Sequence, residues 1–215
     1  MGLVVGLSVF GYIIGSVSIS SLISKHWANV DILSFGSRNA GASNVGQLLG
    51  FKAMVVVGCL DLGKSAVSVF LLRHFGFSSE VILIFAAALI AGHCWSCLLR
   101  FKGGRGVASL TGVILGLSWF GVLAAGLSIA SLGLIFGYRA LFVALTLIGL
   151  PVIGLLFDKD PLELVCLVAI LFVKRLTGNA LVPQSPDGML MGYLRRLIFD
   201  RDIASNADWI HGVKR

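Results

Sequence analysis

Long apolar segments without a charged residue constrain this chain more than any other feature. A helix needs about 20 apolar residues to cross the hydrocarbon core of a bilayer, and Gly2–Ser24 meets this requirement with no charge. Hydrophobic residues make up 57% of the chain and charged residues only 13%, whereas soluble domains carry about 25% charged residues. The sequence therefore predicts an all-α fold, a polytopic membrane bundle.

Further spans follow, and one stretch allows two interpretations. The expected spans are Phe51–Phe75, Val81–Leu99, Leu141–Phe157 and Pro161–Val173. The charge-free stretch Gly106–Tyr138 is too long for one helix and short for two. It forms either one span or a helical hairpin that turns near Ser118–Trp119.

The distribution of basic residues favours the hairpin, because Lys and Arg concentrate in cytoplasmic loops. A hairpin gives seven transmembrane helices, with the N-terminus outside and the C-terminus inside. Fourteen of the 17 basic residues then lie on the cytoplasmic side, namely Lys25, Arg38, Lys52, Arg100, Lys102, Arg105, Arg139, Lys174, Arg175, Arg195, Arg196, Arg201, Lys214 and Arg215. The net charge of +7 therefore suits anionic headgroups and anionic substrates, and we expect no nucleic-acid partner.

We expect two parts in the chain, a membrane domain over residues 1–178 and a cytoplasmic tail over residues 179–215. The tail contains Gly188–Phe199, whose apolar residues share one helix face, with Arg195 and Arg196 turned away. These apolar residues are Leu190, Met191, Leu194, Leu197 and Ile198. The pattern is typical of an interfacial amphipathic helix, most simply an anchor without a part in catalysis.

A polar loop follows the first span on the cytoplasmic side. The stretch Phe35–Asn44 reads FGSRNAGASN, and its candidate ligand-binding residues are Ser37, Arg38, Asn39, Gly41, Ser43 and Asn44. Backbone N–H groups and short polar side chains in such a loop can bind an anion. Taken alone, the stretch is also compatible with an ordinary polar turn.

A second, glycine-rich loop joins the third span to the fourth. Lys102, Gly103, Gly104, Arg105 and Gly106 lead into the helix that carries Ser109. Glycine lets a backbone approach a ligand closely, a helix N-terminus attracts phosphate, and Lys102 and Arg105 add charge-assisted hydrogen bonds. The alternative is a basic loop that only reflects topology.

Three ionisable residues lie inside predicted spans, where such groups are costly and usually functional. Asp61 and Lys64 are three residues apart on one helix face and can pair, either as a structural ion pair or to brace the polar site. His93 is expected about two turns below the glycine-rich loop, in a supporting position. We expect no metal and no cofactor, because Cys94 and Cys97 next to it lack a second pair of ligands.

Four motifs in this order resemble the bacterial acyl-phosphate:glycerol-3-phosphate acyltransferase family. They are Gly15-Ser16, the Ser37–Asn44 loop, Asp61 with Lys64, and Gly92-His93 followed by Phe101–Ser109. The resemblance covers roughly residues 8–178. It implies a multi-pass enzyme of the bacterial cytoplasmic membrane. The implied reaction transfers an acyl group from acyl phosphate to glycerol 3-phosphate and forms lysophosphatidate, and a monomer is compatible with it.

The resemblance also implies roles for individual residues. His93, Lys102 and Arg105 would be catalytic, and the two loops would form the halves of a phosphate site, with Lys174 and Arg175 as further substrate-binding residues. No protein base is implied, because a phosphate of the substrate would take the hydroxyl proton.

Several positions depart from the family pattern. Gln47 stands where the family has an arginine, and Arg38 and Arg105 replace a glycine and a lysine. The third motif lacks its histidine and asparagine, since Ala169–Phe172 is apolar. These departures leave two alternatives open, namely an acyltransferase with a changed acceptor and a non-catalytic paralogue that binds lipid or an anion. A transporter is less favoured, because the sequence shows no internal repeat.

Overall fold

The protein is described here from a computed structural model, which describes residues 1–179, 185 and 187–201. Within these residues the regular elements are helices, accompanied by one isolated antiparallel bridge between Ser96 and Lys102. The all-α prediction is therefore confirmed for this part of the chain. The chain divides into two compact units, Met1–Ser118 and Trp119–Arg215.

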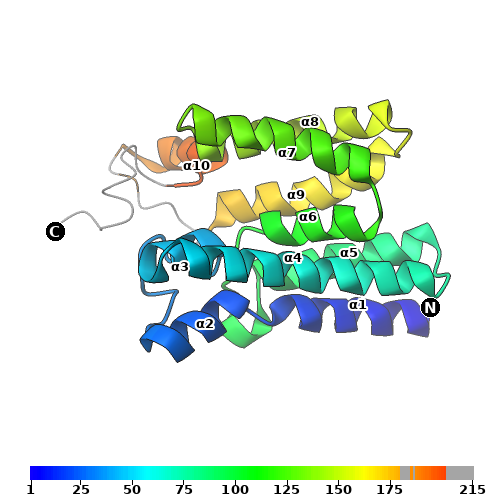
Figure 1. The fold of residues 1–215 in the computed structure, drawn as a ribbon, viewed down its shortest axis with the longest axis horizontal. Helices are drawn as coiled ribbons and strands as arrows, with labels where there is room; N and C mark the ends of the chain where they lie inside the picture. The colour runs from blue at the N-terminus through cyan, green and yellow to red at the C-terminus, as the bar shows by residue number, and fades with distance from the viewer. Residues whose placement is uncertain (180–184, 186, 202–215) are drawn as a thin grey trace. The chain divides into compact units, whose positions relative to one another are not determined.

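The first unit is built from helices joined by loops (Figure 1). Its elements are α1 (Gly2–Ser16), α2 (Ile19–Ala28), α3 (Ala42–Leu49), α4 (Phe51–His74), α5 (Ser79–Cys94), the 3-10 helix η1 (Cys97–Leu99) and α6 (Val107–Gly116). Helix α1 packs along α5, and α4 packs against α6 and α3. The span predicted over Val81–Leu99 corresponds to α5, which ends earlier than expected, at Cys94, where the chain turns into the glycine-rich loop.

A break at Val17 and Ser18 separates α1 from α2, so the prediction of one continuous helix over Gly2–Ser24 is wrong at this point. Both residues adopt extended backbone conformations. The Ser18 hydroxyl accepts a hydrogen bond from the Ser21 N–H at 3.3 Å and starts α2. Irregular backbone at membrane depth persists only where protein groups satisfy its N–H and C=O groups, and such groups surround this break.

Glycines allow α1 and α5 to touch through their backbones. A Cβ added at Gly15 would lie 2.0 Å from the Leu89 carbonyl oxygen, and one at Gly92 would lie 2.1 Å from the Tyr12 carbonyl oxygen. No side chain fits at either position, and small residues at helix contacts are typical of membrane bundles. The contact places the end of α5 beside the break in the first span.

The described part of the second unit contains four helices, α7 (Phe120–Ile135), α8 (Arg139–Leu156), α9 (Pro161–Thr177) and α10 (Met189–Phe199). The interruption between α6 and α7 confirms the turn predicted near Ser118–Trp119. Pro161 starts α9, and the Asp160 carboxylate accepts a hydrogen bond from the Leu162 N–H at 2.8 Å.

Helix α10 is the helix predicted in the tail, and Arg196 attaches it to α9. The buried Arg196 guanidinium donates hydrogen bonds to the carbonyls of Leu176 at 2.7 Å and Thr177 at 3.1 Å. The exposed apolar side chains of α10 are Met189, Leu190, Met191, Leu194 and Ile198. Arg196 is therefore buried against the end of α9. The amphipathic pattern of the sequence did not predict the burial of this side chain.

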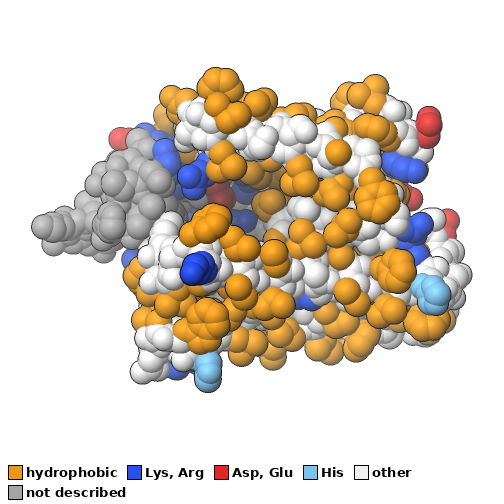
Figure 2. Space-filling model, viewed as in Figure 1, with side chains coloured by type: hydrophobic (Ala, Val, Ile, Leu, Met, Phe, Trp, Pro, Cys, Tyr) orange, Lys and Arg blue, Asp and Glu red, His pale blue; other side chains and the backbone are white. Residues whose placement is uncertain are grey.

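Among the residues that the structure describes, three helical segments are long and apolar enough to cross a membrane by length and composition. They are Gly2–Ala28, which includes the break, Phe51–His74 and Arg139–Leu156, and shorter apolar helices occur at Ser79–Cys94, Val107–Gly116 and Phe120–Ile135. Hydrophobic side chains cover the middle of the visible face of the first unit, with charged side chains mostly near its helix ends (Figure 2). An apolar exterior of this kind suits lipid. The number of spans and their orientation remain predictions.

Candidate functional site

The two polar loops that the sequence singled out lie side by side in the first unit. The Ala40 N–H donates a hydrogen bond to the Gly103 carbonyl at 3.2 Å. A Cβ added at Gly104 would lie only 2.9 Å from the Ala40 carbonyl oxygen. Residues more than 60 positions apart in the sequence are therefore direct neighbours in the structure.

The glycine-rich loop rests on the last turn of α5. The Gly104 N–H donates to the His93 carbonyl at 3.0 Å. A Cβ at Gly103 would lie 2.3 Å from that same carbonyl oxygen, and a Cβ at Gly104 would lie 2.1 Å from Nε2 of His93. Both positions require glycine because the helix end and the imidazole already occupy the space. His93 thus contacts the loop directly, and the expected distance of two turns is wrong.

The loop continues into the N-terminus of α6. Gly106 precedes this helix with φ of +79°, a conformation that glycine adopts readily, and it offers no capping side chain. The first N–H groups of a helix lack partners within the helix and form a favourable place for a phosphate. Lys102 is exposed at the loop surface, while Arg105 is half-buried with its Nε and Nη1 atoms covered.

Asn44 organises the other loop. Its amide nitrogen lies within hydrogen-bonding distance of the carbonyls of Ile32 (3.1 Å), Phe35 (2.9 Å) and Asn39 (3.0 Å), and its oxygen accepts from the Ser37 N–H at 3.1 Å. The side chain is almost completely buried. These contacts occupy the polar atoms of Asn44, so its geometry favours shaping the loop over contacting a ligand.

Two polar atoms, one in the polar loop and one in the first turn of α6, are buried without a hydrogen bond within the described residues. They are Oδ1 of Asn39 and Oγ of Ser109. Buried polar groups are normally hydrogen-bonded, and an unsatisfied one costs about 1–3 kcal/mol. The remaining residues of the polar loop differ, since Arg38 and Ser43 are exposed and Gly41 starts α3.

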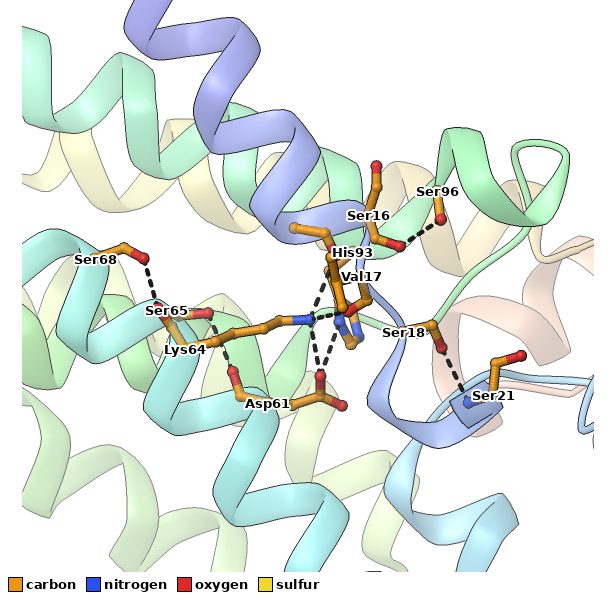
Figure 3. A network of polar contacts seen from close by, with 11 residues as sticks. Ser16, Val17, Ser18, Ser21, Asp61, Lys64, Ser65, Ser68, His93 and Ser96 are labelled. Atoms are coloured by element: carbon orange, nitrogen blue, oxygen red, sulfur yellow. Dashed lines mark hydrogen bonds and ion pairs between the residues drawn. The ribbon is translucent and has the colours of Figure 1, made fainter. Parts of the chain in front are cut away.

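Asp61, Lys64 and His93 form a buried polar network behind the loops (Figure 3). Nζ of Lys64 lies 2.9 Å from Oδ1 of Asp61, which confirms the predicted pair. The same ammonium donates to the carbonyls of Gly15 at 3.3 Å and Val17 at 2.8 Å, at the break between α1 and α2. Nδ1 of His93 lies 3.7 Å from Oδ1 of Asp61. The three residues therefore join the break to the glycine-rich loop.

Serines complete this arrangement, and sequence reasoning did not assign them a role. The Ser96 hydroxyl donates to the Ser16 carbonyl at 2.6 Å, and the Tyr12 hydroxyl donates to the Trp95 carbonyl at 2.5 Å. Both bonds tie the end of α5 to the end of α1. The only sequence signal for them was the pair Gly15-Ser16, which the motif comparison included without a structural reason.

Lys174 and Arg175 lie near the end of α9, in the second unit. Nζ of Lys174 lies 2.8 Å from Oδ1 of Asn179. The Arg175 guanidinium donates to the carbonyls of Leu197 at 2.8 Å and Ala140 at 3.2 Å. Both side chains are buried, and these bonds connect helix ends within their own unit. Among the residues that the structure describes, no group of three or more His, Cys, Asp or Glu side chains could hold a metal ion.

Apolar helices around an ionic network, beside a basic, glycine-rich loop, are typical of an integral membrane protein. Comparison with known proteins identifies the family. The profile of the glycerol-3-phosphate acyltransferase family matches residues 5–180, and the chain therefore belongs to this family.

Individual relatives agree with this assignment. A glycerol-3-phosphate acyltransferase from Janthinobacterium sp. (strain Marseille) is 36% identical over 175 residues, covering 78% of this chain and 87% of that protein. Another from Thermoanaerobacter sp. (strain X514) is 35% identical over 111 residues, which cover 52% of this chain and 56% of that relative's length.

A solved structure is similar as well. The glycerol 3-phosphate form of PlsY (YgiH), an integral membrane glycerol 3-phosphate acyltransferase, superposes with a TM-score of 0.72 at 27% identity and covers 80% of this chain and 88% of that chain. Its lysophosphatidic acid form gives a TM-score of 0.71. Shared fold and shared sequence thus point to the same family.

Proposed function

We propose that the protein transfers an acyl group from acyl phosphate to the hydroxyl of glycerol 3-phosphate, forming lysophosphatidate. The observation that carries this proposal is the hydrogen bond between Ala40 and Gly103, which joins the two loops into one surface. Family membership and the similarity to PlsY in its glycerol 3-phosphate form support the acceptor. The resemblance of the motifs supports acyl phosphate as the donor.

The chemistry needs positioning and charge neutralisation more than a protein nucleophile. The acceptor hydroxyl attacks the acyl carbon, the bond from that carbon to the phosphate oxygen breaks, and inorganic phosphate leaves. A substrate phosphate takes the hydroxyl proton. Because acyl phosphate is an activated mixed anhydride, donors aimed at the developing charge and correct alignment of the reactants supply most of the acceleration.

The glycine-rich loop suits the transferring phosphate. In our proposal, Lys102 and Arg105 neutralise its charge, and Gly103, Gly104 and Gly106 let backbone N–H groups approach its oxygens. We assign the Ser109 hydroxyl, which is buried without a hydrogen bond among the described residues, as a further donor to this phosphate.

The polar loop suits the phosphate of the acceptor. Ser37, Arg38, Asn39, Gly41 and Ser43 are assigned to this role, and Asn44 holds the loop in shape. Arg38 supplies the guanidinium charge that the family has at position 47, although from a different backbone position.

The site faces the cytoplasm in this proposal. We infer seven spans with the N-terminus outside and the C-terminus inside, in the bacterial cytoplasmic membrane, because this orientation places most basic residues inside. The exposed apolar face of α10 would lie in the membrane interface. A monomer contains both loops and suffices for the reaction. Cysteine labelling from either side of the membrane, at single sites introduced in the loops, tests the orientation.

Turnover by purified protein tests the function. The wild type should convert acyl phosphate and glycerol 3-phosphate to lysophosphatidate with release of phosphate. Lys102→Met should lower kcat/KM by at least about a hundredfold, the scale of losing one preorganised charge donor. Lys159→Met, which removes a basic residue from the second unit outside the proposed site, is the matched control. Absence of turnover in folded wild-type protein, also with related polyol phosphates, would overturn the proposal.

A non-catalytic role is the second candidate, and the apolar stretch Ala169–Phe172 with Gln47 favours it. Such a paralogue would bind lipid or an anion without transfer. Calorimetric binding of glycerol 3-phosphate without turnover would favour this candidate, whereas complementation of a strain that lacks the acyl-phosphate-dependent enzyme would exclude it.

A further inference from the structure

We propose that Asp61 is a positioning residue for the glycine-rich loop and that it acts through His93. This inference rests on the proposed function, because the loop is assigned to the transferring phosphate. Asp61 lies on α4, is 1% exposed and contacts neither loop in the interactions described above. Its effect must therefore pass through a neighbour.

Asp61 has two neighbours with different tasks (Figure 3). Lys64, at 2.9 Å, donates to the carbonyls of Gly15 and Val17 and so satisfies the break between α1 and α2. This side of Asp61 is structural, because the carboxylate balances a cation at membrane depth. On the other side, Nδ1 of His93 lies 3.7 Å from the same carboxylate oxygen, and the imidazole is not part of the structural pair.

His93 carries the effect of Asp61 to the loop. Its Nε2 lies against Gly104, where a Cβ would approach to 2.1 Å, and its carbonyl accepts the Gly104 N–H at 3.0 Å. The imidazole of His93 thus lies directly against the loop backbone at Gly104. A rotation of the ring therefore acts on Gly104, and the effect can reach the second loop because the Ala40 carbonyl also lies close to Gly104 and the Ala40 N–H bonds to the neighbouring Gly103.

The orientation of this ring requires a partner because a histidine ring can turn about its side-chain bonds. The carboxylate of Asp61 faces Nδ1 and so favours one ring orientation, with Nε2 toward the loop. An Asn at position 61 keeps the size of the side chain but loses the negative charge. Misplacement of reacting groups by about 1 Å can cost a hundredfold in rate, so kcat/KM for acyl phosphate should fall between about tenfold and a hundredfold.

A double substitution separates this positioning role from simple charge balance. Asp61→Asn alone leaves the Lys64 cation without its carboxylate and is expected to destabilise the protein. Asp61→Asn combined with Lys64→Gln removes both charges and retains hydrogen-bond donors for the Gly15 and Val17 carbonyls. If Asp61 acts through His93, this double variant recovers thermal stability but keeps the loss in kcat/KM. Recovery of both properties would overturn the proposal.

A cycle with His93→Gln tests the path of the effect. Variants that act along one path are not additive, whereas independent sites add. The combination of Asp61→Asn, Lys64→Gln and His93→Gln should therefore be no less active than His93→Gln alone. Ser68→Ala is the matched control on α4, because the Ser68 hydroxyl donates only to the carbonyl of Lys64 among the hydrogen bonds described for it, and it should leave kcat/KM within about twofold of the wild type. Additive losses would contradict the inference.

Hydrogen exchange gives a readout that does not depend on turnover. Amide exchange over residues 100–109 should increase in the neutral double variant and in His93→Gln, and stay unchanged in Ser68→Ala, because exchange reports local opening. Increased exchange together with an inactive wild type would reject the proposed function while supporting the positioning of the loop by Asp61. Unchanged exchange in the neutral double variant would reject the inference itself, whether or not the wild type is active.

Discussion

Basic side chains that are buried or half-buried bond to helix ends in both units, but in different ways. In the first unit, Lys64 donates a hydrogen bond to the Val17 carbonyl just after α1. It also pairs with the Asp61 carboxylate, which faces His93. In the second unit, Arg175 and Arg196 donate to carbonyls near the ends of α9 and α10. Cations are favourable at helix C-termini in both cases. Of these two sets of contacts, only the one in the first unit is connected, through the His93 imidazole, to a loop with candidate ligand-binding atoms.

This difference distinguishes the two units with respect to the proposed site. The first unit retains the loops, the glycines that let them meet and the ionic network behind them. The second unit has apolar residues where the family's third motif has a histidine and an asparagine, and its arginines tie helices together. We therefore expect substitutions in the first group to affect activity more than stability, and the reverse in the second.

We expect the largest effect from a substitution at Gly104, which tests the importance of the first unit for activity most directly. Gly104→Ala places a Cβ 2.1 Å from Nε2 of His93 and 2.9 Å from the Ala40 carbonyl oxygen. The loop must move, and kcat/KM should fall by more than about a hundredfold. Gly63→Ala on α4, where a Cβ meets nothing within 4 Å, is the control and should be neutral or stabilising by up to about 1 kcal/mol. Steady-state kinetics with thermal unfolding distinguishes the two variants, and an active Gly104→Ala enzyme would contradict the tight contact.

Asn44→Ala should produce the next largest effect. It removes the donor to three loop carbonyls and the acceptor for the Ser37 N–H, and unsatisfied buried groups cost about 1–3 kcal/mol. We expect a lower melting temperature and a tenfold or greater rise in KM for glycerol 3-phosphate. Asn44→Asp keeps an acceptor for the Ser37 N–H but turns a carboxylate oxygen toward the three carbonyls, so it should lower stability at least as much as Asn44→Ala. If stability falls while KM stays constant, the loop does not form the acceptor site.

Arg196→Met tests the second unit, with a smaller effect on activity. The guanidinium bonds to the Leu176 and Thr177 carbonyls are lost, while the apolar stem keeps much of its packing. A loss of about 1–3 kcal/mol in stability is expected, with kcat/KM within about threefold of the wild type. Protease sensitivity between α9 and α10 should increase. If Arg196→Met lost more activity than Asn44→Ala, the expectation that the first unit matters more for activity would be wrong.

Gln47→Arg should have the smallest effect, and in the opposite direction. Gln47 is exposed on α3, with its side-chain oxygen close to Gly36. An added guanidinium would restore the family's charge near the polar loop, and one charged hydrogen bond contributes about 1.5–3 kcal/mol at most. We expect KM for glycerol 3-phosphate to fall severalfold without a change in kcat. An unchanged KM would indicate that Arg38 already neutralises the acceptor phosphate.

Local sequence patterns predicted much of this architecture. The length and composition of apolar segments located α4 and α8, because a membrane-spanning helix has a characteristic size and composition. Spacing along one helix predicted the contact of Asp61 with Lys64, since residues three apart share a face. The break at Val17 and Ser18 was missed because its residues are uncharged like the helix around them, and the donors that stabilise it come from α4 and from the segment that follows α5.

By itself, the sequence determined the helical membrane character, the family and the identity of the two loops, because composition and motifs are properties of short segments. Tertiary structure decided that Ala40 meets Gly103, that the His93 ring lies against Gly104 and that Asn44 faces inward to its own loop. It also decided that Arg196 is buried at the end of α9. Each of these contacts joins residues from different elements, and their geometry depends on how closely helix backbones pack, which glycine permits but does not specify.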